Sequence, residues 1–450
     1  MTIPGRQPRG LSRHRRGVGR SQIVAGAAAV IASQGVTSAT GYVFWLIAAR
    51  RYPAHQVGQA ASITSLSIAI ALVASQAVVA SLLVRLPRSE AGRPLLWSGA
   101  VMSGGGAAAL GTVSVLLLPV LIPDLRILHS PLIAVAMIVM CVSQCLGLVA
   151  DGAALALARF RLVAGRNAVF GAGKVAVAVA LMAMVAHNGP AVLLCAWAGV
   201  GSATGIFALW RLHRLTEGSG WAFRTVAGGF GYQMVTAIGG SAPAQLLPTI
   251  VAAQAGAMMS GYFSLTWLVG GLCFTISPAV SRAMLPTSRE NLSQSTRQAL
   301  KIIAALLVVP IGLFLGFGRE ILAVFGEKYG VYGAGLLALL AISAIPDAIT
   351  NVAVARWRIQ ERLRPAAMLN ALIAVVALGL VLSVLKASTG NIALIGAAWI
   401  AAQTAGCGFV AVRSAVLRLT GARRRVLVPV QGPGVIAAHR VVGSGDAASR

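Results

Sequence analysis

Long apolar segments separated by short polar loops limit what this chain can fold into. A helix needs about 20 apolar residues to cross a bilayer, and we expect such helices at 21–49, 57–84, 95–122, 130–158, 167–186, 190–210, 226–252, 257–281, 299–318, 331–355, 365–385 and 391–412. Charged residues make up only 10% of the sequence, against roughly 25% in soluble domains. The sequence therefore predicts an all-α polytopic membrane protein with about 12 transmembrane helices.

The positions of the basic residues support this helix count. Cytoplasmic loops of membrane proteins carry an excess of Lys and Arg, and in this chain both tails and every second loop are rich in them. Apart from Lys174, which lies within a predicted helix, the opposite side holds only Arg50, Arg51, Arg126, Arg319, Lys328 and Lys386. The alternation predicts a multi-pass protein with both termini in the cytoplasm. The preference for Arg over Lys and the abundance of Ala, Gly and Val are typical of a GC-rich bacterial genome, so we expect the bacterial plasma (inner) membrane.

The net charge of +27 would indicate nucleic-acid binding in a soluble protein. Here the cations form short clusters between apolar runs, where they orient helices and attract anionic lipid. We therefore expect membrane lipids, and no nucleic acid, as partners.

The chain ends are predicted to be basic cytoplasmic tails, at 1–20 and 414–450. The first apolar run is longer than the core of a secretory signal, and Arg50-Arg51 follows it instead of a small-residue cleavage site. It is therefore expected to anchor the chain. The C-terminal tail combines basic residues with Gly, Pro and Ser and is expected to be disordered and to face lipid.

Two short patterns recur at a spacing of 197 residues. Arg159 in Ala156–Leu162 matches Arg356 in Ala353–Ile359 at that spacing. The arginines that end two predicted helices, Arg85 and Arg282, are separated by the same interval.

A repeat of about six helices returns the chain to the same side of the membrane, so its copies are parallel. We expect an N-lobe at 21–214 and a C-lobe at 224–413 around a central cavity, joined by an interfacial linker at 215–223. This architecture is typical of transporters that work by alternating access.

Three ionisable residues lie inside predicted helices, where a charge is costly and often functional. Asp151 and Asp347 occupy near-equivalent places in the repeat, and Lys174 lies at a similar depth, about 12 Å from the cytoplasmic clusters. One interpretation pairs Lys174 with Asp151 across a helical hairpin; in the others these residues serve substrate or ion coupling, or extend to the lipid interface. Asp347 faces no cation on the matching stretch Met368–Ile373. It either binds and releases a proton or Na⁺ during transport or has a structural hydrogen-bonding role.

Four arginines form a second set of candidates. Arg50 and Arg51 follow the first predicted helix on the outer side, and Arg85 and Arg282 end two others on the inner side. Arg can bind phosphate oxygens through two parallel hydrogen bonds, as recognition of a diphosphate requires. Arg85 and Arg282 are also consistent with anchors at the cytoplasmic interface, whereas Arg50 and Arg51 depart from the positive-inside rule.

No motif for catalysis or for a cofactor occurs in the sequence. The segment Gly171–Lys174 lacks the first glycine of a P-loop and the Ser or Thr that follows its lysine. The five cysteines lie in apolar runs without metal-binding spacing. We therefore expect no enzyme, no cofactor and no metal, and transport without nucleotide hydrolysis.

Three parts of the sequence carry a family resemblance: Ala48–Gln59 with Leu82–Pro87, Gly261–Ser264 leading to Pro286, and Phe325–Tyr329. Residues 21–413 resemble the polysaccharide flippase branch of the multidrug/oligosaccharidyl-lipid/polysaccharide exporter superfamily. The resemblance implies a flippase that moves a polyprenyl-diphosphate-linked oligosaccharide to the outer leaflet for cell-surface polysaccharide synthesis, driven by a proton or Na⁺ gradient.

Arginines in the cavity hold the diphosphate in such families. Arg50, Arg51, Arg85 and Arg282 fall where family members tend to have basic residues. The chain departs from the family in lacking cations deep in its first, second, seventh and eighth predicted helices.

The expected partners are a lipid-linked glycan, membrane lipids and polysaccharide-assembly proteins such as a polymerase. Three alternatives stay open. A multidrug exporter of the same superfamily would need an acidic, aromatic-lined cavity. A flippase for the lipid precursor of peptidoglycan would carry more arginine in its cavity, and a membrane scaffold for polysaccharide assembly would transport nothing.

Overall fold

The computed structural model describes residues 20–426 apart from 90, 186–187, 228–229, 284–291, 361 and 389. Side chains are described from residue 35 to residue 416, with further gaps at 230–242, 282–283 and 363. Most of the basic tail predicted at 1–20, and the C-terminal tail after Val426, lie outside the described residues.

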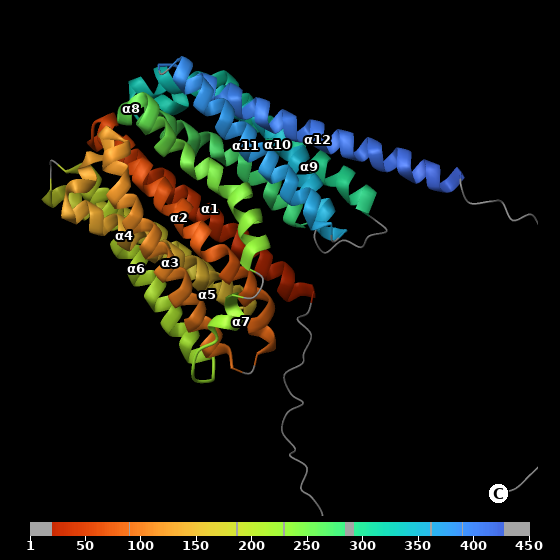
Figure 1. Cartoon of the computed structure of the whole chain (residues 1–450). Helices are drawn as coiled ribbons and strands as arrows, with labels where there is room; N and C mark the ends of the chain where they lie inside the picture. Colours follow the sequence, from red (N-terminus) through yellow and green to blue (C-terminus); the bar gives the residue numbers. More distant parts are fainter. Residues whose placement is uncertain are drawn as a thin grey trace, which may run out of the picture. The chain divides into compact units, whose positions relative to one another are not determined.

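Helices form almost all of the described chain (Figure 1). The elements are α1 (Arg20–Arg51), α2 (Ala54–Arg85), η1 (Leu86–Arg88), α3 (Gly92–Leu121), η2 (Pro123–His129), α4 (Pro131–Ala156), α5 (Phe160–Met184), α6 (Gly189–Leu215), α7 (Phe223–Ala227), α8 (Phe230–Ala283), α9 (Leu292–Ala323), α10 (Glu327–Ile359), α11 (Leu363–Ala387) and α12 (Ala393–Val426). Wherever the structure describes the backbone, no strand is present.

Each helix predicted from the apolar segments is present. The predicted helices 226–252 and 257–281 correspond to two arms of α8, which meet at a break at Gly256, where φ is 88°. Among the described residues, ten helices are long and apolar enough to cross a membrane. The predicted fold class, an all-α polytopic membrane protein, is confirmed.

Proline, glycine and asparagine set several helix boundaries. Pro131 and Pro190 lie in the first turns of α4 and α6, where a missing N–H costs no helical hydrogen bond. Asn188 caps α6, because its side-chain oxygen accepts a hydrogen bond from Ala191 N at 3.3 Å. Gly326 turns the chain into α10 with φ of 144°, a conformation that strains any residue with a Cβ.

Helix α12 extends past its predicted end at residue 412 and continues to Val426. The first residues of the tail that we predicted to be disordered are therefore helical. Hydropathy detects only the membrane-spanning part of a helix, whereas Ala, Leu and Arg favour helix in water as well. Among the described residues, those up to Cys407 form one compact unit and those from Gly408 on belong to a second. The division into lobes at 215–223 stays a prediction.

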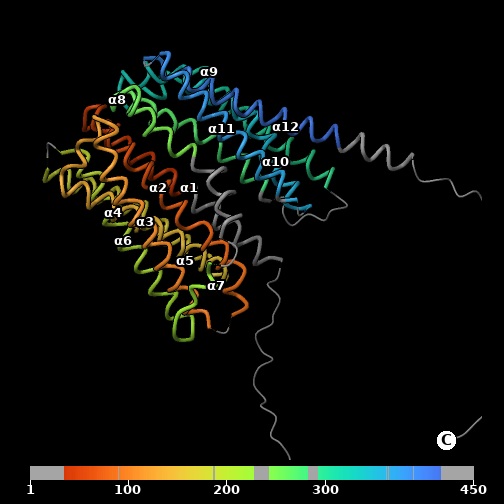
Figure 2. Tube along the Cα trace, in the orientation of Figure 1, coloured from red at the N-terminus to blue at the C-terminus, as the bar shows by residue number. Residues whose placement is uncertain are grey.

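The first half of the chain (α1–α6) meets the second half (α8 to Cys407 of α12) along α2 and α8, which run side by side (Figure 2). A Cβ on Gly58 of α2 would overlap the carbonyl oxygen of Ala257, and a Cβ on Gly261 of α8 would overlap that of Ala54. Small residues let membrane helices approach backbone to backbone in this way. Glycine at both positions is therefore required by the contact between the halves.

We expect Gly58→Ala to lower the Tm of the purified protein in detergent. The added methyl group has no space, and overpacking typically costs about 1–3 kcal/mol. Gly105→Ala in α3 is the matched control, because no atom lies within 4 Å of the added Cβ and alanine favours a helix by about 0.5–1 kcal/mol. Equal Tm values for the two variants would contradict the close contact.

Candidate functional site

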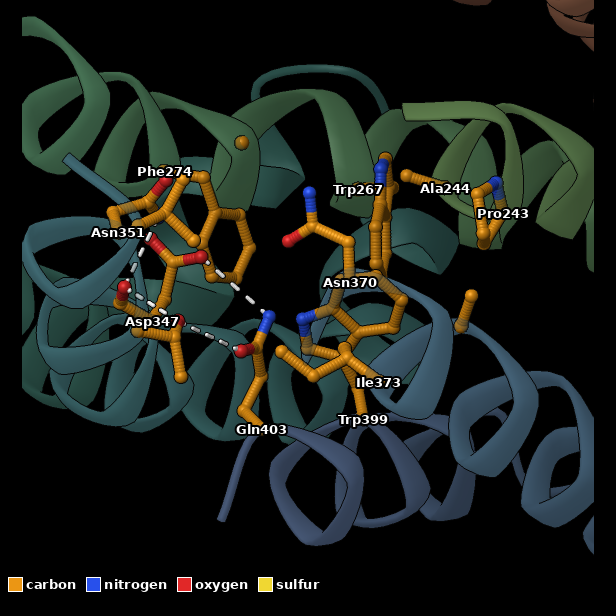
Figure 3. A pocket seen from close by; sticks show the side chains of 14 residues that line it. Pro243, Ala244, Trp267, Phe274, Asp347, Asn351, Asn370, Ile373, Trp399 and Gln403 are labelled. Atoms are coloured by element: carbon orange, nitrogen blue, oxygen red, sulfur yellow. Dashed lines mark hydrogen bonds between the residues drawn. The ribbon is translucent and has the colours of Figure 1, made fainter. Parts of the chain in front are cut away.

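A cavity of about 230 Å³ lies in the second half of the chain, among α8, α10, α11 and α12 (Figure 3). Three aromatic side chains, Trp267, Phe274 and Trp399, form much of its wall. Its polar lining consists of Asp347, Thr350, Asn351, Asn370 and Gln403. The cavity is therefore amphipathic, with one acidic group.

Asp347 of α10 is held by neutral groups. Ser277 Oγ donates a hydrogen bond to Asp347 Oδ2 at 2.5 Å, and Gln403 Nε2 lies 3.5 Å from Oδ1. Asn351 Nδ2 donates to the carbonyl oxygen of Asp347 at 3.0 Å and to Ser277 Oγ at 3.2 Å. Within the described residues the carboxyl group has no ion-pair partner. The expectation that no cation neutralises Asp347 is thus consistent with its surroundings.

This arrangement suits reversible binding of a small cation or a proton. A carboxylate among hydroxyl and amide groups can accept a proton or contact a cation without first breaking a salt bridge. Ionisable groups at such positions mark ion and proton pathways in many membrane proteins. The cavity wall keeps an unused donor as well: Trp399 is 8% exposed, and its Nε1 has no partner within the described structure.

The sequence interpretation found Asp347 but missed the rest of this cavity. Trp267 and Trp399 meet edge to face, with ring centroids 4.9 Å apart. Asn370 and Gln403 point toward the same space as Asp347 (Figure 3). Their polar amides within apolar helices were the available signal, because such groups are costly in a membrane unless they bond or bind.

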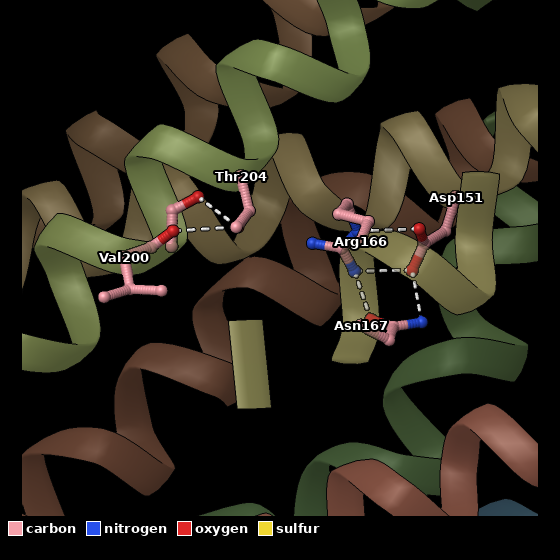
Figure 4. A network of polar contacts seen from close by, with 6 residues as sticks. Asp151, Arg166, Asn167, Val200 and Thr204 are labelled. Atoms are coloured by element: carbon pink, nitrogen blue, oxygen red, sulfur yellow. Dashed lines mark hydrogen bonds and ion pairs between the residues drawn. The ribbon is translucent and has the colours of Figure 1, made fainter. Parts of the chain in front are cut away.

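Asp151 of α4 forms an ion pair with Arg166 of α5 (Figure 4). Arg166 donates from Nε to Oδ1 at 2.8 Å and from Nη2 to Oδ2 at 2.6 Å, and Asn167 Nδ2 lies 3.5 Å from Oδ2. The predicted pairing of Asp151 with Lys174 is therefore wrong. Arg166 stands near the start of α5, beside the end of α4, and its planar guanidinium matches both carboxylate oxygens.

Lys174 lies instead among aromatic rings of α1, α5 and α6. It is 2% exposed, and its Nζ lies 4.0 Å from the ring centroid of Trp197, 5.0 Å from that of Phe170 and 5.8 Å from that of Phe44. The faces of aromatic rings attract a cation. Within the described residues, no hydrogen bond or ion pair reaches Lys174, so the rings stabilise its charge without neutralising it.

The predicted arginines do not gather around the cavity. Arg50 Nε donates to the carbonyl oxygen of Val324 at 2.7 Å, and the Arg51 guanidinium lies 5.9 Å from the ring centroid of Tyr52. Arg85 donates to the carbonyl oxygen of Thr225. The side chain of Arg282 lies outside the described residues. None of the three described arginines lines the cavity around Asp347, so their role toward a diphosphate stays a prediction.

No family model matches the sequence, and no curated protein matches it. Several solved structures do match this chain. The lipid II flippase MurJ in an inward closed conformation matches with a TM-score of 0.69 at 11% identity, covering 86% of this chain and 86% of that chain. A multidrug resistance MATE family transporter of the MOP superfamily in an inward-facing conformation matches with a TM-score of 0.62 at 11% identity, covering 84% and 99%. An outward-facing conformation of such a transporter gives 0.55 at 10% identity, covering 88% and 96%.

These identities are low, so the similarity shows the fold. The chain has the fold of MOP superfamily transporters, the superfamily named in full above. The fold that the resemblance implies is confirmed, whereas membership of the superfamily and of its polysaccharide flippase branch stays a proposal.

We expect Asp151→Ala to lower the Tm more than Lys174→Met. Removing Asp151 leaves the largely buried guanidinium of Arg166 without its carboxylate, which should cost about 1–3 kcal/mol because both partners keep some exposure. Lys174→Met removes a buried charge that has no anionic partner within the described residues and should leave the Tm unchanged or raise it. Thermal unfolding in detergent measures both, and a larger loss for Lys174→Met would contradict this account of the two charges.

Proposed function

We propose that the chain is a secondary transporter, with no enzymatic activity of its own. It flips a polyprenyl-diphosphate-linked oligosaccharide across the bacterial plasma membrane for cell-surface polysaccharide synthesis. The observation that carries this proposal is the fold shared with a lipid II flippase over 86% of both chains. That neighbour is named as a lipid II flippase, and a flippase for a lipid on the same fold supports a lipid-linked substrate for this chain.

Alternating access supplies the mechanism. The two halves rock against each other around a substrate held between them, as expected for parallel repeats. In the proposed orientation the Arg50 end of the helices faces outward and the basic Arg85 end faces the cytoplasm. Asp347 binds the coupling proton or Na⁺ in the second half, and the charge of Lys174 favours an anionic head group on the first.

A multidrug exporter of the same superfamily is the second candidate, and one observation favours it. Such an exporter needs an acidic, aromatic-lined cavity. The cavity around Asp347 has one acidic group and three aromatic side chains in its wall. A lipophilic organic cation would find both charge complementarity and cation–π contacts there. Lipid analysis and drug sensitivity in the same depleted cells separate the two candidates.

Depletion of the protein should trap a glycolipid on the cytoplasmic side of the membrane. Lipid extraction and mass spectrometry should then show at least a severalfold accumulation of one polyprenyl-diphosphate-linked sugar, whose mass identifies the glycan. Re-expression of the wild-type chain should reverse the accumulation. An unchanged lipid profile together with raised sensitivity to cationic drugs would transfer the proposal to the multidrug exporter.

Asp347→Asn should abolish coupling while leaving the fold intact. The amide keeps the size and part of the hydrogen bonding of the carboxyl group but cannot take up a proton or neutralise Na⁺. We expect at least a tenfold loss of flipping activity in depleted cells complemented with this variant, at unchanged protein abundance. Asn370→Ala is the matched control for disturbing the same cavity without removing its charge. Full activity of Asp347→Asn would favour a scaffold or a different coupling residue.

A further inference from the structure

Asp124, in the short helix η2 of the first half, contacts the break in α8 of the second half. Its Oδ2 accepts a hydrogen bond from the backbone N–H of Ala257, the first residue after the break at Gly256. The N–H groups in the first turn of a helix have no partner within the helix, and a carboxylate both satisfies one of them and favours the helix dipole. Asp124 therefore caps the second arm of α8 from the other half of the molecule.

Asp124 is held in position by its own half. Gln59 Nε2 of α2 donates to the carbonyl oxygen of Asp124 at 2.7 Å. A Cβ on Gly256 would lie 3.2 Å from Asp124 Oδ2, so the glycine leaves room for the carboxylate. The break in α8 and the position of the aspartate fit each other.

Arg50 makes a second contact of the same kind at the same end of the helices. It lies in the last turn of α1, and its Nε donates to the carbonyl oxygen of Val324, the residue that follows α9. Carbonyl groups at the C-terminal end of a helix lack partners within the helix and attract a cation. An acidic residue of the first half thus caps a helix start in the second half, and a basic residue caps a helix end.

Three residues along α2 and α8 from the contacts of Asp124, the two halves are joined by further hydrogen bonds. Ser62 of α2 bonds to Ser260 Oγ at 2.8 Å and donates to the carbonyl oxygen of Pro248 at 3.1 Å, and Thr249 Oγ1 donates to the carbonyl oxygen of Ser62 at 3.1 Å. Ser62 and Ser260 are fully buried. Opening this end must expose these hydroxyl groups and break both caps.

We propose that Asp124 and Arg50 form a latch that holds the Arg50 end of the transporter closed. The latch consists of charged side chains of the first half that cap helix ends of the second half. Both residues are exposed, so water can replace the lost contacts when this end opens, and the caps bias the equilibrium without making it irreversible. The inference rests on the proposed alternation between two open states, but its test requires no substrate.

Accessibility of a buried cysteine measures the latch. Ser260→Cys places a thiol at a position that is 0% exposed when this end is closed. A membrane-impermeant maleimide is added to intact cells, and the labelling rate of the full chain is followed by its mass shift. The chain without Ser260→Cys is labelled in parallel, and the labelling of its five native cysteines is subtracted as background.

Adding Asp124→Ala or Arg50→Gln to the Ser260→Cys chain should raise the labelling rate about three- to tenfold, because each variant removes one cap. The double variant should approach the product of the two effects, since the caps lie on different helices. Asp124→Asn keeps an acceptor oxygen and should change the rate less than Asp124→Ala. Arg51→Gln, the matched control, should leave it unchanged, because Arg51 contacts Tyr52 of its own half.

Equal labelling in all variants would overturn the latch, as would an equal rise for Arg50→Gln and Arg51→Gln. If Asp124→Ala fails to accumulate in the membrane, Arg50→Gln and Asp124→Asn decide the question. A raised labelling rate in cells whose lipids are unaffected by depletion would keep the latch and reject the flippase. Accumulated glycolipid together with an unchanged labelling rate would keep the flippase and reject the latch.

Discussion

Inside a bilayer each backbone N–H and C=O group must find its partner within the protein, because no water is present to supply one. This requirement makes long helices the only element of the described membrane-spanning chain, and it makes each helix break costly. Gly256 breaks α8, and Gly326 turns the chain between α9 and α10. Near both places an exposed charged side chain from the first half supplies a partner, Asp124 for Ala257 N and Arg50 for the carbonyl oxygen of Val324, and water can replace it when the halves part. The contacts between the halves are thus solutions to backbone hydrogen bonding, and this is why they can respond when the halves move.

Burying an ionisable side chain also costs free energy, and the described residues offset this cost in three ways. Asp151 is neutralised by a bidentate pair with Arg166, which suits a structural role. Lys174 lies between aromatic faces, and Asp347 is bonded to a hydroxyl and to amides. Only the last two groups have no opposite charge beside them within the described residues. They are therefore the ones whose interactions can change when a substrate or an ion arrives.

Much of the fold could be predicted from the sequence, because a membrane imposes a length on each helix and a charge bias on each loop. The two arms of α8 followed from those rules. The partner of Asp151 did not, since Arg166 and Lys174 lie on the same helix and only the rotation and tilt of α5 decide which of them reaches α4. Arg50 was singled out because it breaks the positive-inside rule, but its partner Val324 lies far away in the sequence and has no side-chain signal. The aromatic wall of the cavity was missed for the same reason: Trp267 and Trp399 come from helices whose facing sides become known only when they pack.

Within the described residues, the buried charges without an ion-pair partner differ in sign between the two halves of the chain. Lys174 lies in the first half, and the residue 197 positions later is Ala371. Asp347 lies in the second half, and its near-equivalent in the first half, Asp151, is paired with Arg166. A cationic drug would be attracted by Asp347 and repelled by Lys174, so the two residues together give no net electrostatic attraction for it. In the proposed function, the anionic diphosphate is favoured by Lys174, and the small cation that accompanies or opposes its movement is favoured by Asp347. The asymmetry therefore supports an anionic substrate coupled to a cation more than a cationic one, although the wall of the cavity taken alone would suit either.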